Sequence, residues 1–426
     1  MSRKEAPTHK QRSSAGYPSR RTLLKATGTV GLAGLAGCLG NGSGGSTIKI
    51  GGTVPQSGPY GAFGLNEKKG IQKAVDDANA NNDAGDGKKV EVQFIDTKTD
   101  PATGRKKAQE LINKDVDFLV GSLSSSVALA ISDLAEKHKK IYMGFAGSNK
   151  ITGSRCRPYT FIASSSAVQQ TSSGLGSVLK QGLGKSVYEI AADYEWGHSI
   201  QNWNENHLVP HYNGNYVGKK FVPLGTSDFS QAITEAKNSG ADIIQFTEFG
   251  LDFQKSAKQA DQYGLFDQAV CVWPSVDIVD AKPVGQSTLA NKNFFGGTTW
   301  YYQQTNSDAG KKFANEFTKK YNEPPTSFAA AAYASVRTLL RASKQAGGTK
   351  ASDVQAKLEG AKLFPQLWGV GERFRKCDHR ATISSPTIQG RSPSEVNEWN
   401  MFKVVDFPSN PEKTQMRDCA NTGCSL

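Results

Sequence analysis

The sequence lacks a long apolar segment near its N-terminus, although a short apolar run occurs there. Residues 26–37 form an uncharged stretch of 12 residues, many of them Gly or Ala. A helix that spans a bilayer needs about 20 predominantly apolar residues. We therefore expect no transmembrane helix from this stretch. Its place after a basic region is typical of a targeting segment instead.

The motifs of common enzyme classes are also missing. The sequence has no GxSxG nucleophile elbow, no P-loop and no HExxH zinc motif. His207 and His211 have the spacing of two metal ligands on one helix face, but Pro210 between them is expected to end that helix. We therefore predict no catalytic residue, no metal site and no cofactor.

Basic residues outnumber acidic ones, but they are not clustered. The chain has 51 Lys and Arg against 39 Asp and Glu, a net charge of +12. Residues 1–37 hold seven Lys and Arg against one Glu, which leaves a net charge of +6 on the remainder. A nucleic-acid partner would require a basic stripe with motif support. Since neither is present, we predict no nucleic-acid binding.

The N-terminal segment has the order of an export signal. Arg20 and Arg21 precede the apolar run and are typical of a twin-arginine signal. Residues 35–38, "LAGC", resemble a lipobox, the signal by which the cysteine of a prolipoprotein is lipidated and the chain is cleaved just before it. Two acyl chains on Cys38 would anchor the protein stably to the outer face of the cytoplasmic membrane. The alternative is a plain signal peptide with an incidental cysteine.

Five cysteines follow the lipobox. Cys271 lies in the apolar run "AVCVW" and is predicted to be a buried free thiol. The other four lie in polar surroundings, and an exported protein can form disulfides. We expect two disulfides and leave open which of the three pairings occurs; a small loop between Cys419 and Cys424 is one feasible bond. The four are Cys156, Cys377, Cys419 and Cys424.

Strand and helix patterns alternate from Thr47 onward. Strand patterns at "TIKIGGTV", "VEVQFID", "DFLVGS" and "IYMGF" are separated by helix patterns. A second series starts at "KSVYEIAAD" and closes at "AVCVW", and helices are expected over 311–321 and 328–346. Successive β–α–β units predict parallel sheets with helices on both faces. The two series therefore predict an α/β fold of two doubly wound lobes.

Open α/β sheets bind ligands beyond the carboxyl ends of their strands, where helix N-termini expose free N–H groups. Ser124, Ser125 and Ser126 occupy such a place after "FLVG", where they could hold a carboxylate. Any one of them could instead simply cap the helix. The segment "MGFAGSNKIT" surrounds Phe145 with small residues, so that backbone can approach a small ligand.

The second series offers aromatic and acidic residues at its strand ends. Tyr194 and Trp196 in "ADYEWGHS" could close over a ligand, unless they are ordinary packing. Glu248 and Asp277 follow two later strands and are candidate partners for an ammonium group. Solvated surface carboxylates are the alternative interpretation of both.

Five stretches carry a resemblance to a known family: "IKIGGTVPQSGPYGAFG", "LVGSLSSSVALAISDLAEKHKKIYMGFAGSNKIT", "ADYEWGHS", "LGTSDFSQAITEAKNSGADII" and "AAAAYASVRTLLRASKQAGGTKASDVQAKLEG". In this order the chain resembles the solute-binding lipoproteins of ABC importers that have the type I periplasmic-binding fold, similar to the leucine/isoleucine/valine-binding group. The resemblance spans about residues 47–405. It implies two lobes that are joined by three hinge crossovers and enclose a small ligand.

The resemblance also implies site residues. Ser125 and the backbone around Phe145, Ala146 and Gly147 would hold a ligand carboxylate on the first lobe. Trp196 matches an aromatic contact on the second lobe, with Tyr194 nearby. The implied parts are a signal at 1–37, a lipidated tether at 38–46, lobe 1 at 47–163 and 297–370, and lobe 2 at 164–296 and 371–426.

The implied ligand is a branched-chain or other neutral amino acid that is delivered to ABC permease and ATPase subunits by a monomeric binding protein. No carboxylate follows "VCVW" until Asp277, where the family expects an acidic partner for the ammonium group. An amide, a urea-like solute or an aromatic carboxylate is therefore an alternative ligand. A ligand-sensing subunit without transport and an anchored hydrolase are alternative functions.

Overall fold

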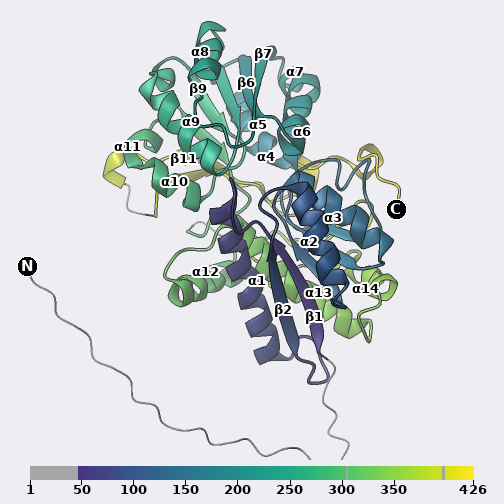
Figure 1. Cartoon of the computed structure of the whole chain (residues 1–426). Coiled ribbons are helices and arrows are strands. Elements are labelled where there is room, and N and C mark those ends of the chain that lie inside the picture. The colour runs from purple at the N-terminus through teal and green to yellow at the C-terminus, as the bar shows by residue number, and fades with distance from the viewer. Residues whose placement is uncertain (1–46, 304–305, 396–398) are drawn as a thin grey trace, which may run out of the picture. The chain divides into compact units, whose positions relative to one another are not determined.

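The computed structural model describes residues 47–303, 306–395 and 399–426 (Figure 1). The predicted signal and the whole predicted tether, Cys38 included, lie outside these residues. Within the described ranges, no helix is long and apolar enough to cross a membrane.

The first sheet has five parallel strands in the order β2-β1-β3-β4-β5. Helices follow these strands as the sequence predicts. Asp100 caps α2, since its carboxylate accepts a hydrogen bond from the Thr103 N–H at 2.7 Å, and Pro101 occupies the first turn. The elements are β1 Ile48–Val54, α1 Gly61–Asn81, β2 Val90–Asp96, α2 Pro101–Ile112, β3 Phe118–Gly121, α3 Ser125–Lys137, β4 Ile141–Gly144 and β5 Thr160–Ile162.

The second sheet has seven strands in the order β12-β11-β10-β9-β8-β6-β7. Strands β6 to β10 are parallel, whereas β11 and β12 add an antiparallel edge that the sequence patterns do not predict. The strands are β6 Ser186–Ala192, β7 Asn215–Val222, β8 Ile243–Thr247, β9 Val270–Trp273, β10 Phe294–Gly297, β11 Thr387–Gly390 and β12 Phe402–Asp406. Two sheets with flanking helices confirm the predicted α/β class.

The chain passes between the two sheets three times. It crosses after β5, returns after β10 to helices α12 to α14, and crosses again before β11. Helix α13 lies beside α1 (Figure 1). The remaining helices are α4 Ala167–Ser173, α5 Leu175–Lys180, α6 Glu195–Trp203, α7 Val209–His211, α8 Ser230–Asn238, α9 Leu251–Gln262, α10 Ile278–Val284, α11 Gln286–Leu289, α12 Asp308–Tyr321, α13 Ser327–Gln345, α14 Ala351–Leu358 and α15 Pro411–Thr414.

The final segment contacts both sheets. Residues of β11 and β12 extend the second sheet, whereas the His379 ring stacks on Phe161 of β5 with 4.0 Å between ring centroids. The Arg380 backbone also bridges to Ile162 of the same strand. The last crossover therefore packs against β5 of the first sheet before the chain enters the second sheet.

The helical run that contains Pro210 ends at His211, one residue later, in agreement with the prediction that Pro210 ends it. A π-helical turn at Asn204–Leu208 widens the helix just before it, and Pro210 then lies in the first turn of α7. His207 and His211 pack against Trp203 and Tyr212, respectively.

The cysteine predictions are confirmed, and the structure gives the pairing. Cys156 bonds to Cys424 and Cys377 bonds to Cys419, so the small loop between Cys419 and Cys424 does not form. Cys271 is a buried free thiol, and burial raises its pKa.

Candidate ligand-binding site

A small cavity lies where strands of both sheets end. Its volume is about 20 Å³, enough for the centres of one or two waters. Known ligand pockets enclose roughly 300–1,000 Å³. The lining must therefore move apart to admit a solute. The lining residues follow β1, β3, β4, β6, β8 and β9 or lie on α4, α6 and α13: Tyr60, Leu123, Gly147, Gln170, Tyr194, Trp196, Phe249, Ser275 and Phe328.

Two tyrosines meet across the cavity. The hydroxyl oxygens of Tyr60 and Tyr194 lie 2.7 Å apart, and burial raises the pKa of both. Each tyrosine directly precedes a helix, α1 or α6. Gly64 and Gly197 lie in the first turns of these helices, where a Cβ would stand 1.7 Å and 1.9 Å from a carbonyl oxygen. Only glycine allows such tight strand-to-helix turns, which aim the tyrosines at each other.

Trp196 covers another wall of the cavity. Its indole N–H donates to the side-chain oxygen of Gln170 at 2.7 Å, and both residues are buried. A Cβ on Gly147 would stand only 2.9 Å from the indole ring. The backbone of Gly147 in the segment after β4 therefore packs directly against the Trp196 side chain of α6. This contact joins elements of the two sheets.

Aromatic rings close the remaining side. Phe249, which follows β8, packs on Phe63 of α1 with 4.0 Å between centroids and on Phe328 of α13 at 5.5 Å. Tyr60 also meets Phe249 edge-on at 5.2 Å. The cavity is thus mainly apolar and aromatic, with the Gln170 amide, the Ser275 hydroxyl and the tyrosine hydroxyls as its polar groups.

The predicted serines lie beside the cavity and do not line it. The Ser125 hydroxyl accepts a hydrogen bond from the Ser148 N–H at 3.1 Å and so holds the segment after β4. The Ser124 hydroxyl is buried and has no hydrogen bond to any described residue. Ser126 is half-buried. Leu123, which directly precedes Ser124, is the residue of this turn that lines the cavity.

Phe145 and Ala146 support the segment after β4 from behind. Both are fully buried, and Phe145 packs in the core of the first sheet. The Ala146 carbonyl accepts hydrogen bonds from the Ser164 hydroxyl at 2.9 Å and from Arg380 at 3.4 Å. Of the predicted residues after β4, only Gly147 borders the cavity.

The two predicted acids do not line the cavity, and neither is a solvated surface group. Asp277 accepts the N–H groups of Ile278 and Ser327 at 2.7 Å each, so it caps α10 and fixes the start of α13. Burial raises its pKa to about 6. Glu248 is fully buried, and neither of its carboxylate oxygens forms a hydrogen bond with a described residue. Burial raises its pKa, while the nearby Ser256 hydroxyl lowers it.

Six lining residues were not predicted from the sequence: Tyr60, Leu123, Gln170, Phe249, Ser275 and Phe328. The sequence could have indicated Tyr60 as a site residue, because it lies in the glycine-rich turn directly after the first strand. Gln170 and Phe328 lie on α4 and α13, helices that reach the site only because the chain crosses between the two sheets. In the described part of the chain, no three His, Cys, Asp or Glu side chains are grouped to hold a metal ion.

Two α/β lobes with an aromatic cavity at their strand ends define a type I solute-binding protein. The family described as periplasmic binding protein matches residues 47–391. The chain therefore belongs to the periplasmic binding protein family. This confirms the predicted resemblance.

Curated relatives and solved structures agree with this assignment. "Leu/Ile/Val-binding protein homolog 3" of Brucella melitensis biotype 1 is 25% identical over 376 residues, which cover 84% of this chain and 93% of that protein. "Leu/Ile/Val-binding protein homolog 6" of the same organism is 28% identical over 71% of this chain and 77% of its own length. A periplasmic binding protein from Burkholderia mallei has a TM-score of 0.81 at 27% identity and covers 89% of this chain and 99% of its own.

Proposed function

We propose that this protein is the extracytoplasmic solute-binding component of an ABC importer. The observation that carries the proposal is the cavity built from both sheets, whose walls meet through Tyr60 with Tyr194 and Gly147 with Trp196. A solute held there touches both lobes and stabilises only the closed arrangement. The solute shifts the population from open to closed protein by the ratio of its affinities for the two states. The closed form would then dock on the permease.

The lining favours a small solute with an apolar body. Five of its nine residues are aromatic, and none of the nine is charged. The relatives named as Leu/Ile/Val-binding protein homologues, at 25–28% identity, support a branched-chain or other neutral amino acid. The Gln170 amide and the Ser275 hydroxyl would then meet the polar end of the solute.

One observation favours a second ligand class. Asp277 does not line the cavity, and each of its carboxylate oxygens already accepts a backbone N–H group, so it is not placed to take an ammonium group. Glu248 adjoins the lining residue Phe249, and Glu195 lies between Tyr194 and Trp196, but neither acid lines the cavity itself. An aromatic carboxylate requires no such partner and would stack on the aromatic walls. It is the alternative ligand.

A thermal-shift screen separates the two classes. Leucine, isoleucine and valine form one set, and benzoate with 4-hydroxybenzoate forms the other. A ligand at 100 times its Kd stabilises the folded state by about 2.7 kcal/mol, which raises Tm visibly. Calorimetry of each hit then checks for saturable one-to-one binding without turnover. Turnover of a bound compound, or no stabilisation by any member of either set, would contradict the proposal.

Delivery and anchoring are part of the same proposal. Uptake of the bound solute into cells should require the neighbouring permease and ATPase, which distinguishes an importer from a sensor. The monomer should suffice for binding, since one chain supplies both walls of the cavity. Lipidation of Cys38 would hold the protein near the permease, with the residues that follow as the tether.

A further inference from the structure

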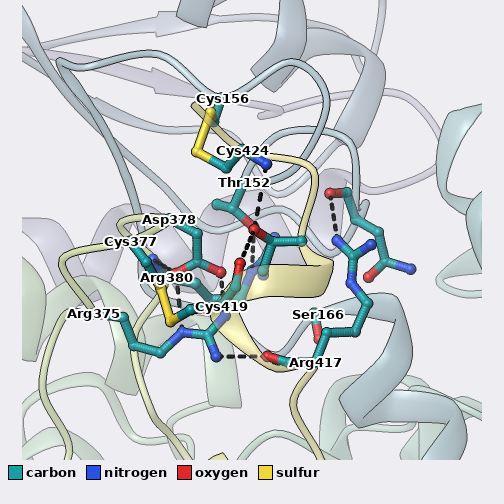
Figure 2. Close-up of polar contacts among 12 residues, drawn as sticks. Thr152, Cys156, Ser166, Arg375, Cys377, Asp378, Arg380, Arg417, Cys419 and Cys424 are labelled. Atoms are coloured by element: carbon teal, nitrogen blue, oxygen red, sulfur yellow. Dashed lines mark hydrogen bonds and ion pairs between the residues drawn. A yellow bond between two sulfur atoms is a disulfide. The ribbon is translucent and has the colours of Figure 1, made fainter. Parts of the chain in front are cut away.

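Three arginines gather near the C-terminal end of the chain. Arg375, Arg380 and Arg417 lie close to Asp378 and to both disulfides (Figure 2). Arg375 pairs with Asp378 through two of its guanidinium nitrogens. Three guanidinium groups thus share one carboxylate, which leaves a net charge of +2 in a largely buried place.

The partners of Arg380 do not offset its charge. The side chain is 1% exposed and donates to the Thr152 hydroxyl at 2.9 Å. Its other hydrogen bonds go to the backbone carbonyls of Ser164 and Ser148 at 3.0 Å each, and of Ala146 at 3.4 Å. These groups are dipoles and carry no net charge. Burial lowers the pKa of Arg380 to about 9, with Arg375 and Arg417 acting in the same direction and Asp378 opposing.

Arg417 also lacks an acidic partner among the described residues. It donates only to the carbonyls of Asn149 and Asn421, both at 3.4 Å. Burial and Arg375 lower its pKa, and Asp378 opposes them.

Nearby carboxylates do not pair with the three arginines: Asp418, next to Arg417, is exposed and forms no ion pair with a described side chain. Glu412 pairs with Arg373 at 2.7 Å, and Glu195 pairs with Lys150 at 2.9 Å. A buried charge without a counter-charge is costly. The excess charge of the arginine cluster therefore remains uncompensated by the described side chains.

A cavity lies inside this cluster. Its walls are the three arginines and Asp378 together with Asn149, Thr152, Ser166 and Met416. Its volume is about 10 Å³, which is the size for the centre of one water or one monatomic ion. A tetrahedral oxyanion such as sulfate is too large for it.

We propose that this cavity is a binding site for a single small inorganic anion of the halide class. The anion would face three guanidinium groups that retain N–H donors beyond their protein contacts. The disulfide between Cys377 and Cys419 ties together the two segments that carry the arginines, which fixes the site before the anion arrives. The site is separate from the aromatic cavity, so it stands whether or not the proposed transport function does.

Thermal unfolding in chloride tests the site. The wild-type protein is compared in sodium chloride and in sodium gluconate of equal ionic strength, because gluconate is too large to enter. We expect a Tm about 2–4 °C higher in chloride. The variant Arg417→Gln should lose this difference and should be at least as stable as wild type in gluconate. Arg417 is half-buried, so the substitution is compatible with folding.

Arg373→Gln is the matched control, since Arg373 is also half-buried but pairs with Glu412. It should keep the chloride-dependent shift of the wild type. Crystals soaked in bromide should in addition show an anomalous peak between the three arginines. A chloride effect of equal size in wild type and Arg417→Gln, or no bromide at the cluster, would overturn the proposal.

Discussion

Replacing Gly147 by alanine tests whether the two lobes must approach closely to hold a solute. The added Cβ would stand 2.9 Å from two atoms of the Trp196 indole and 3.1 Å from the Gln170 side-chain oxygen. Ordinary contacts of a Cβ begin near 3.4 Å. The segment after β4 and helix α6 would therefore have to separate by about 0.5 Å. The backbone of Gly147 is not in the left-handed region, so alanine introduces no backbone strain there.

The expected loss of affinity follows from this overlap. Extra atoms in a packed contact cost typically 1–3 kcal/mol. The cost falls on the closed arrangement alone, because in an open arrangement the methyl group has space. Since 1.4 kcal/mol corresponds to a tenfold change in Kd, solute binding should weaken by about 5- to 150-fold. The free energy of unfolding should change little, since opening relieves the overlap.

Isothermal titration with the solute found in the screen measures this effect. Gly348→Ala is the matched control, because no atom lies within 4 Å of the Cβ that it would add. That variant should bind like wild type. If Gly147→Ala bound the solute with unchanged affinity, the contact between Gly147 and Trp196 would not belong to the closed, solute-bound form, and the reasoning would be refuted.

Three further predictions concern stability and anchoring. Burial raises the pKa of Asp252 to about 6, so the folded state keeps the proton to a higher pH than the unfolded chain, and stability is lost as pH rises from about 4 to 6. Between pH 4.5 and 7.5, the free energy of unfolding in urea should fall by about 2 kcal/mol less in Asp252→Asn than in wild type. Equal decreases in the two proteins would contradict this. Replacing Cys377 and Cys419 by serine opens a link between residues 42 positions apart and should cost about 4 kcal/mol of unfolding free energy in the same assay. Cys38→Ser should move the protein from the membrane fraction to the soluble fraction on cell fractionation, whereas retention in the membrane would argue against a lipid anchor.

The order of strands and helices could be predicted because each parallel strand is a short apolar run between helix patterns. That signal found β1 to β4 and β6 to β9. It failed at β5 and at β10 to β12, whose sequences "TFI", "FFGG", "TIQG" and "FKVVD" are short or weakly apolar. These strands form through their pairing partners, which no local pattern reveals.

The site could be predicted only where it coincides with strand ends. Tyr194, Trp196 and Gly147 follow their strands closely, and all three line the cavity. Glu248 and Asp277 also follow strands, but the local pattern does not reveal whether a carboxylate faces the cavity or caps a helix. Among the described residues it is the packing of helices from separate crossovers that decides which side chains complete the walls.

Small-angle X-ray scattering with and without saturating solute tests the central claim most directly. The account predicts that the solute identified by the screen lowers the radius of gyration of the wild-type protein, and that Gly147→Ala shows a smaller decrease at equal occupancy. Saturable binding with superimposable scattering curves would contradict it, because the solute would then be held without the two lobes closing on it.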